Sequence, residues 1–285
     1  MKLSVEVRGV SKKYGPRKVF DGLDLELSPG VTGLLGPNGA GKSTLMRCLA
    51  STLLPDSGRV HVVGLDLSDR DQRLRARRTI GYLPQELGLC PQFSVAAMVD
   101  YVAILNEITD RRLRRREVDR VLEQVDLLAE RKTRVRKLSG GMRQRLGIAI
   151  ALIGDPRFLI LDEPMVGLDP EQRMRFRGLL SRLGEDRIVL LSTHQTEDVA
   201  ALCRRVLVMR GGVFLFDGPP HEIAGKAAGQ VWLSAHSSTD GQTGWRAADG
   251  RYRVVGQPPP DAVPAEPTVE DGYLVLLNAT VENAV

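Results

Sequence analysis

The chain has 285 residues, 42% of them hydrophobic and 26% charged, so its composition is that of a globular protein rather than a disordered one. Its formal net charge of +5 suits nucleic acid, an anionic membrane surface or an anionic ligand, and so excludes none of them. The cysteines, Cys48, Cys90 and Cys203, form no CxxC pair and indicate neither a zinc cluster nor a disulfide framework, so we expect them to fill apolar positions in a reducing compartment.

The first part of the chain is rich in strand patterns. Residues 1–35 predict strands, because "LSVEVRGV" and "VFDGLDLELSPG" alternate and "VTGLLG" is a short apolar run into glycine. A helix is predicted over 43–54, and further strand regions over 59–67 and 79–85. No sustained apolar stretch follows the first charges, so we expect no secretory signal. No apolar run reaches about 18 residues, so we expect no membrane span, and any work at a membrane would need another subunit.

A glycine-rich segment lies between one of these strands and the helix. Gly36 to Ser43 fits the pattern GxxxxGK[ST]. Glycines let backbone N–H groups wrap phosphate oxygens, and the following helix points its N-terminus at the same anion. Lys42 adds a positive charge near the β- and γ-phosphates, and the Ser43 hydroxyl can bind Mg²⁺. A chance glycine turn is the alternative, and the strand–loop–helix context argues against it.

Helical spacing dominates the middle of the chain, from about 90 to 153. This region contains a basic run over 110–120, with the sequence "DRRLRRREVDR". Three interpretations are open for this run: a solvated helix face is favoured, anionic lipid headgroups come second, and nucleic acid is third.

Two continuous apolar runs then predict buried parallel strands, "RFLILDEP" over 157–164 and "RIVLLSTH" over 187–194. Parallel strands linked by helices indicate an α/β core. Asp162 and Glu163 end the first of these strands, where α/β sheets place their ligands. Asp162 suits a Mg²⁺ shell and Glu163 suits the polarisation of an attacking water. A plain turn after a strand is the alternative, and the phosphate loop makes an ATP or GTP hydrolase the better interpretation.

The C-terminal part changes character again. "RVLVMRGGVFLFDGPP" predicts a β-hairpin that turns at Gly211 and Gly212. Beyond about residue 225, "QVWLSA" and "RYRVVG" predict strands and "QPPPDAVPAEP" an extended linker. A last helix is predicted from Thr268 as its N-cap, with Asp271 in the first turn. We therefore expect a small α+β accessory domain over 226–285 and a first domain over 1–225.

One further segment makes the family recognisable. "KLSGGMRQRLGIAIAL" over 137–152 begins with Ser139, Gly140 and Gly141 and continues as a predicted amphipathic helix, so it is a second helix start suited to phosphate. Here the chain resembles the ATP-binding cassette (ABC) ATPases, whose signature is similar to LSGGQ. Met142 departs from that signature at the position of the glutamine.

The other motifs of the ABC family follow in order over about residues 1–225. Tyr14 resembles the aromatic residue that stacks on adenine, and Gln85 in "GYLPQ" resembles the Q-loop glutamine. His194 resembles the switch histidine, and "GLD" over 167–169 the D-loop. Asp162 and Glu163 resemble the Walker B aspartate and the catalytic glutamate. The phosphate loop, Walker A, is matched by Gly36, Asn38, Gly39, Ala40, Gly41, Lys42, Ser43 and Thr44.

The resemblance implies a fold and a chemistry. The fold is an α/β P-loop NTPase core with a mixed, largely parallel sheet and a helical subdomain inserted over about 88–153. The cofactors are ATP and Mg²⁺, and the metal is held by Ser43, Gln85 and Asp162. Glu163 acts as the general base, His194 holds the γ-phosphate and the water, and Gln85 joins them in the catalytic set.

The resemblance also implies partners. Ser139, Gly140 and Gly141 of a facing chain complete each site, so one copy of every motif implies a dimer closed over two Mg-ATP, formed with a second copy or a homologous ATPase. The ATPase drives a separate transmembrane permease from the cytoplasmic face of the cell membrane, and no nucleic acid is expected. The chain is most similar to the exporter group called ABC-2 type, on "GYLPQELGLCPQFSVAAMVDYVA", "STHQTEDVAALCRRVLVMRGG" and the tail ending "PTVEDGYLVLL".

Three alternatives stay open. An ABC importer ATPase uses the same chemistry with the opposite direction of transport. A non-transport ABC protein acting on ribosomes or DNA is disfavoured, because the chain has one cassette and neither a long coiled coil nor zinc modules. A regulatory protein with inactive motifs is disfavoured by the intact Lys42, Glu163 and His194.

Overall fold

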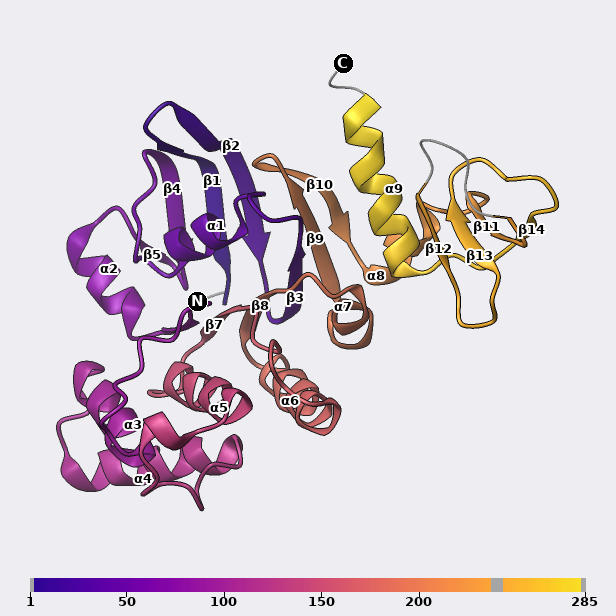
Figure 1. The fold of residues 1–285 in the computed structure, drawn as a ribbon. Helices are drawn as coiled ribbons and strands as arrows, with labels where there is room; N and C mark the ends of the chain where they lie inside the picture. Colours follow the sequence, from indigo (N-terminus) through magenta and orange to yellow (C-terminus); the bar gives the residue numbers. More distant parts are fainter. Residues whose placement is uncertain (1–2, 237–242, 283–285) are drawn as a thin grey trace.

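A computed structural model describes residues 3–236 and 243–282 of the chain (Figure 1). Its centre is a six-stranded sheet in which β3, β6, β7, β8 and β9 pair in parallel and β10 pairs antiparallel to β9. The fold is therefore mixed α/β, as predicted. In sheet order the strands are β10 (Val213–Gly218), β9 (Arg205–Arg210), β3 (Gly30–Leu35), β8 (Ile188–Ser192), β7 (Phe158–Asp162) and β6 (Ile80–Leu83).

The central sheet is buried on both faces, because successive residues of its strands point into two different apolar clusters. In β7, Phe158 and Ile160 belong to one cluster, and Leu159 and Leu161 belong to the other. The first cluster includes α1 (Lys42–Leu49) and a four-stranded antiparallel sheet. That sheet has the order β2 (Arg17–Leu27), β1 (Val5–Tyr14), β4 (Ser57–Val62) and β5 (Leu65–Asp66).

Helices supply the second cluster. Between β6 and β7 the chain forms α3 (Val95–Leu105), α4 (Arg111–Gln124), a short 3₁₀ turn (Val135–Lys137) and α5 (Gly140–Ala151). Figure 1 shows these helices together at one end of the molecule. Outside the segment between β6 and β7, residues 1–225 also form α2 (Arg70–Arg77), α6 (Pro170–Leu183), α7 (Thr196–Leu202) and α8 (Pro220–Gly225).

Several local predictions differ from the structure. The helix predicted over 43–54 ends at Leu49, because Ser51 has a φ of 58°, which breaks the helical path. The strand region 59–67 is two strands joined by a turn at Val63, where φ is 51°. The helix α5 is not amphipathic: its first turn is partly exposed, and its last turns are buried on most sides because it runs into the core.

The C-terminal part forms a separate four-stranded sheet in the order β12 (Thr243–Arg246), β13 (Tyr252–Val255), β11 (Val231–Ser234) and β14 (Val263–Pro264). The predicted linker therefore holds a short strand, β14, which pairs with β11. In Figure 1 this sheet and the helices α3 and α4 lie at opposite ends of the molecule. Within the described residues, no helix is both long and apolar enough to cross a bilayer.

The last helix, α9 (Val269–Glu282), joins this sheet to the rest of the chain. The Thr268 hydroxyl accepts from the Asp271 backbone N–H at 3.3 Å, so Thr268 caps the helix as predicted. A side chain at Gly272 would lie 1.7 Å from the Ile223 carbonyl of α8, so α9 packs directly on that backbone. Further along α9, the Leu277 carbonyl accepts a hydrogen bond from the Arg210 guanidinium of β9.

A buried ion pair holds α9 to the C-terminal sheet. Asp271 is fully buried and accepts from Arg253 of β13 at 3.0 and 2.6 Å. Burial acts to raise the pKa of Asp271, but the Arg253 guanidinium and the Thr268 donors outweigh it and lower the pKa below 3.8. A carboxylate with a lowered folded-state pKa contributes stability above its ordinary pKa and loses it as the pH falls below that value.

We expect Asp271→Asn to lower the free energy of unfolding at pH 7 by about 3 kcal/mol, because Arg253 loses a buried partner. Below pH 3.8 the difference from the wild type should shrink, since the wild-type carboxylate then protonates. Urea unfolding followed by circular dichroism measures both effects. Asp249→Asn breaks an exposed pair with Arg251 and should cost less than about 1 kcal/mol. Equal losses in the two variants would contradict the role given to the Asp271 pair.

Candidate active site

The glycine loop follows β3 directly and its shape requires glycine. A side chain at Gly36 would lie 2.2 Å from the Met209 carbonyl of the neighbouring strand β9. Gly41, the N-cap of α1, has a φ of 108°, which residues with a side chain rarely adopt. The loop therefore turns tightly at the carboxyl end of the sheet and leads into the first turn of α1.

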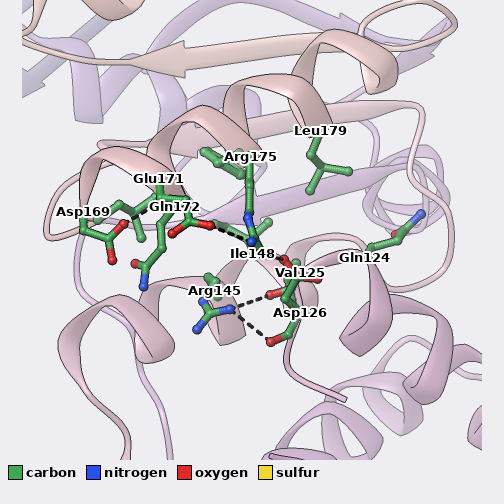
Figure 2. Close-up of a pocket in the computed structure, with 12 residues that line it drawn as sticks. Gln124, Val125, Asp126, Arg145, Ile148, Asp169, Glu171, Gln172, Arg175 and Leu179 are labelled. Carbon is green, nitrogen blue, oxygen red and sulfur yellow. Dashed lines mark hydrogen bonds and ion pairs between the residues drawn. The ribbon is translucent and has the colours of Figure 1, made fainter. Parts of the chain in front are cut away.

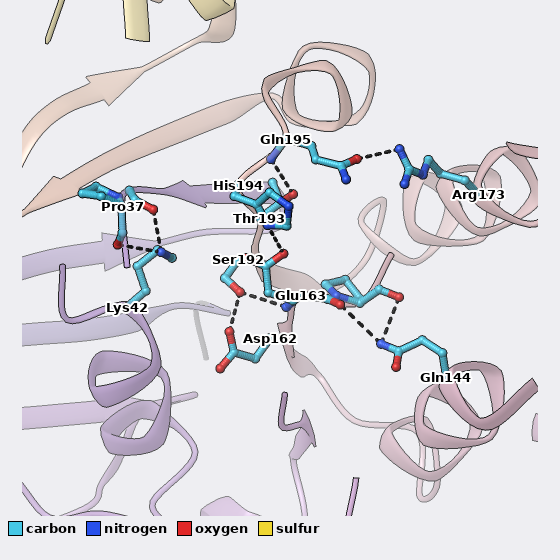
Figure 3. Close-up of polar contacts among 12 residues, drawn as sticks. Pro37, Lys42, Gln144, Asp162, Glu163, Arg173, Ser192, Thr193, His194 and Gln195 are labelled. Carbon is cyan, nitrogen blue, oxygen red and sulfur yellow. Dashed lines mark hydrogen bonds and ion pairs between the residues drawn. The ribbon is translucent and has the colours of Figure 1, made fainter. Parts of the chain in front are cut away.

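Lys42 lies at the start of α1 and is buried, with an exposure of 9%. Its ammonium donates to the Gly36 carbonyl at 2.6 Å and to the Pro37 carbonyl at 3.1 Å (Figure 3). Burial lowers the pKa of Lys42, while the carboxylates of Glu163 and Asp162 act against this shift. The positive charge is thus held beside the loop, close to the two carboxylates.

A groove of about 460 Å³ opens over the loop. It brings together nine of the residues predicted from the sequence. These are Tyr14, Asn38, Gly39, Ala40, Gly41, Lys42, Ser43, Thr44 and Gln85. Arg17 and Lys18 of β2 also line the groove, although our sequence reasoning missed them. No local pattern in the sequence marks these two residues, because they come beside the loop only through the pairing of β1 and β2, and Lys18 is also paired with Asp21 at 2.6 Å.

Asp162 lies at the end of β7, in parallel register with Ser192 at the end of β8. The Ser192 hydroxyl donates to Asp162 at 2.5 Å and accepts from the backbone N–H of Glu163 at 2.9 Å (Figure 3). Sequence reasoning missed Ser192. The sequence pattern that could have revealed Ser192 is a polar residue at the end of an apolar run. Asp162 ends the neighbouring strand β7 in the same way.

Glu163 and His194 contact each other beside this pair. The Glu163 carboxylate lies 3.0 Å from His194 Nδ1, and Glu163 is held at a φ of 52°. The Glu163 side chain is 14% exposed and the His194 side chain is 60% exposed, so the pair reaches from the sheet to the surface. Gln195, the next residue, accepts from Arg173 of α6 at 2.5 Å, which ties the histidine segment to that helix.

The signature residues lie apart from the groove. Ser139 caps α5, and its hydroxyl accepts from the Met142 backbone N–H at 3.2 Å. A side chain at Gly141 would lie 2.6 Å from the Gln172 side chain of α6. None of Ser139, Gly140 and Gly141 is among the residues that line the groove. Within one chain the signature residues therefore lie outside the groove, and Gly36, Asp162, Glu163 and His194 do not line it either.

A second cavity, of about 240 Å³, lies between α6 and the helical region (Figure 2). Arg175 of α6 crosses it and pairs with Asp126 at 3.2 Å and with Glu171 at 2.7 Å. On the other side Arg145 of α5 donates to the carbonyls of Val125 and Asp126 at 3.3 and 3.0 Å. These polar contacts join the helical region to the core, and the cavity is lined by Leu168 and Asp169 of the predicted D-loop but by none of the predicted catalytic, nucleotide-binding or metal-binding residues.

A glycine loop between a strand and a helix, with an aspartate at the end of a parallel strand, defines a P-loop NTPase. The model of the family described as "ABC transporter" matches residues 20–166. The Nod factor export ATP-binding protein I of Cupriavidus metallidurans is 40% identical over 221 residues, which cover 77% of this chain and 72% of the relative. The chain therefore belongs to the ABC transporter family, as an ATP-binding and ATP-hydrolysing subunit.

Two further comparisons agree. The daunorubicin resistance ATP-binding protein DrrA3 of Streptomyces coeruleorubidus is 39% identical over 228 residues, which cover 79% of this chain and 71% of the relative. The dimeric structure of MJ0796, a bacterial ABC transporter cassette, has the same fold, with a TM-score of 0.70 and 24% identity over 75% of this chain and 98% of that one. The predicted family and fold are thus confirmed.

We expect Ser192→Ala to lower kcat for ATP hydrolysis about tenfold, because Asp162 and the Glu163 backbone lose the hydroxyl that orients them. Steady-state phosphate release measures the effect. Thr32→Val is the matched control, since it removes a buried hydroxyl from the middle of β3, and its kcat should stay within about twofold of the wild type. A wild-type kcat for Ser192→Ala would show that this hydroxyl has no part in positioning the two carboxylates.

Proposed function

We propose that the chain is the ATPase subunit of an exporter, and that it closes as a dimer over two Mg-ATP to drive a separate membrane permease. One observation in particular supports dimerisation. The groove over the phosphate loop and the signature at Ser139–Gly141 are two phosphate-binding helix starts, and they do not meet within the chain. A second copy, facing the first, would bring its signature to the groove.

The residues of the groove suit ATP. Tyr14, about half exposed at the end of β1, offers a ring for the adenine to stack on. The loop from Asn38 to Thr44 supplies backbone donors, and Lys42 supplies a charge for the β- and γ-phosphates. Lys42 then exchanges its bonds to the Gly36 and Pro37 carbonyls for bonds to phosphate oxygens.

The donor set also fits Mg²⁺, which prefers oxygen ligands. The Ser43 hydroxyl and the Gln85 amide line the groove, and the Asp162 carboxylate is oriented by Ser192. These three residues would hold the ion. When bound, Mg²⁺ neutralises charge on the β- and γ-phosphates.

Glu163 and His194 suit the hydrolytic step. Glu163 would accept a proton from the attacking water, and its support is that it follows Asp162 directly and that its side chain is partly exposed, at 14%. His194 touches that carboxylate through Nδ1, which leaves Nε2 for the γ-phosphate. Gln85 lines the groove and would orient the water and the metal. Loss of the γ-phosphate removes the group that both chains hold, so the dimer opens.

The relatives favour export over import. The names of the Cupriavidus and Streptomyces relatives describe Nod factor export and daunorubicin resistance. A separate permease is supported by α3, on which Tyr101, Ile104 and Leu105 are 47%, 49% and 62% exposed. Such apolar side chains, exposed together on one helix, indicate a surface that another protein covers. The permease would hold the ATPase at the cytoplasmic face of the cell membrane.

We expect Glu163→Gln to form a dimer in the presence of Mg-ATP and to remain a monomer without it, because ATP stays bound between the two chains when its cleavage is blocked. Size-exclusion chromatography with light scattering measures the mass. Adding Lys42→Ala to this variant should abolish the dimer, since the loop then loses its charge for phosphate. Wild-type turnover by Glu163→Gln would contradict the role of Glu163 as the base. A monomer with ATP would contradict the shared site.

We expect Tyr101→Ser combined with Leu105→Ser to remove the permease, while the ATPase rate of the isolated chain stays at the wild-type value. The test is affinity purification from detergent-solubilised membranes, with mass-spectrometric detection of the membrane protein that co-purifies with the wild type. Leu74→Ser on α2 is the control, because it removes an equally exposed apolar side chain elsewhere. Undiminished recovery of the permease by the α3 variant would show that it docks on another surface.

A further inference from the structure

The helix α4 begins with an electrostatic conflict. Asp110 caps the helix and accepts from the backbone N–H groups of the next turn, but the first turn itself contains no acidic residue. Like charges one turn apart repel, and cations near a helix N-terminus oppose the helix dipole. Arg114 is anchored by Asp100 and by the carbonyls of Ile108 and Thr109. Helix stability does not account for the other four, which are Arg111, Arg112, Arg115 and Arg116.

Some of this charge lines a groove of about 330 Å³ between α3 and α4. Two of its arginines are paired: Arg114 with Asp100 at 2.6 Å, and Arg131 with Asp119 at 3.1 Å. For Arg111 and Arg115, which also line the groove and are exposed, the described residues provide no ion pair. The other lining residues are small or apolar, namely Ala96, Ala97 and Val118.

The positive surface continues past Arg131. Residues 131–135 are fixed to the first turn of α3, because the Val95 and Ala96 backbone N–H groups donate to the Thr133 and Arg131 carbonyls, both at 2.9 Å. A second hollow, of about 500 Å³, follows there. It is lined by Lys132, Thr133, Arg134, Arg136 and Lys137. Arg131 of the first hollow and Lys132 of the second are consecutive in the chain, and we call the two hollows together the basic groove.

We propose that the basic groove binds the phosphate headgroups of anionic phospholipids. Lipid binding here rests on the proposed function, because the apolar face of α3 offered to the permease begins at Tyr101, the residue after Asp100, which lines the groove. A permease on that face would bring the groove to the level of the headgroups. Each Arg or Lys near an anionic membrane surface strengthens binding about fivefold.

The lining of the groove favours lipid over single-stranded nucleic acid. Binding of single-stranded nucleic acid relies on aromatic side chains on which bases stack. The residues that line the two hollows include none. Lipid headgroups need only the charge, and the small apolar floor lets a phosphate approach the guanidinium groups.

The test is co-sedimentation of the purified full chain with vesicles of phosphatidylcholine, alone or with phosphatidylglycerol. We expect binding only to the anionic vesicles, and weaker binding as salt rises. Arg111→Gln combined with Arg115→Gln should weaken it about tenfold or more. The thermal midpoint of this variant should equal or exceed that of the wild type, because a repulsive pair one turn apart is removed.

The control is Arg70→Gln combined with Arg75→Gln on α2, which makes the same change in net charge on two exposed arginines. Its vesicle binding should stay within about twofold of the wild type. Equal loss in both double variants would overturn the proposal in favour of diffuse charge. Absent or salt-independent binding to anionic vesicles would also overturn it.

Two competitors separate lipid from other anions. Inorganic phosphate, at constant ionic strength, should leave vesicle binding unchanged, and displacement by it would identify a site for free phosphate instead. A short DNA duplex that binds more tightly than the vesicles would overturn the lipid assignment. ATP hydrolysis and ATP-dependent dimerisation are measured on the same samples. If the wild-type chain neither hydrolyses ATP nor dimerises with it, the proposed function is rejected. If it does both but does not bind anionic vesicles, only the lipid inference is rejected.

Discussion

The parallel pairing of β3, β8 and β7 is the constraint on which the site depends. Because these strands run in the same direction, their carboxyl ends meet along one edge of the central sheet. That edge carries the glycine loop after β3, Asp162 at the end of β7 and Ser192 at the end of β8. A change in register by one residue would turn Asp162 away from Ser192 and into the apolar cluster on the other face.

The site could be predicted from the sequence wherever its residues form a local pattern. The loop from Gly36 to Thr44 is one continuous segment whose spacing reflects how backbone donors surround phosphate, and the structure has it between β3 and α1 as expected, with Asn38 to Thr44 lining the groove. The ends of the apolar runs located Asp162 and His194 for a similar reason. The contact of Ser192 with Asp162 escaped, because it depends on which strands are neighbours in the sheet and on their register. Arg17 and Lys18 escaped because their role appears only when the β1–β2 turn lies beside the loop.

The local errors have physical causes too. The helix α1 ends at Leu49 although apolar residues continue to Leu54, because the chain takes a left-handed turn at Ser51 that no apolar pattern reveals. The helix α5 was expected to have one apolar face, but its burial increases along its length. That gradient reflects its position, with one end at the surface and the other inside the core. The strand β14 was hidden in a proline-rich segment, where edge pairing tolerates proline.

The hydrogen bond from Arg210 to the Leu277 carbonyl connects the C-terminal part to a strand beside the phosphate loop. Arg210 follows Met209, whose carbonyl fits against Gly36 of the phosphate loop. The accessory sheet is thus connected, through α9 and one strand, to the backbone that shapes the nucleotide site. The appendage is therefore mechanically coupled to the site, because a shift of α9 would also move the Leu277 carbonyl to which Arg210 of β9 donates.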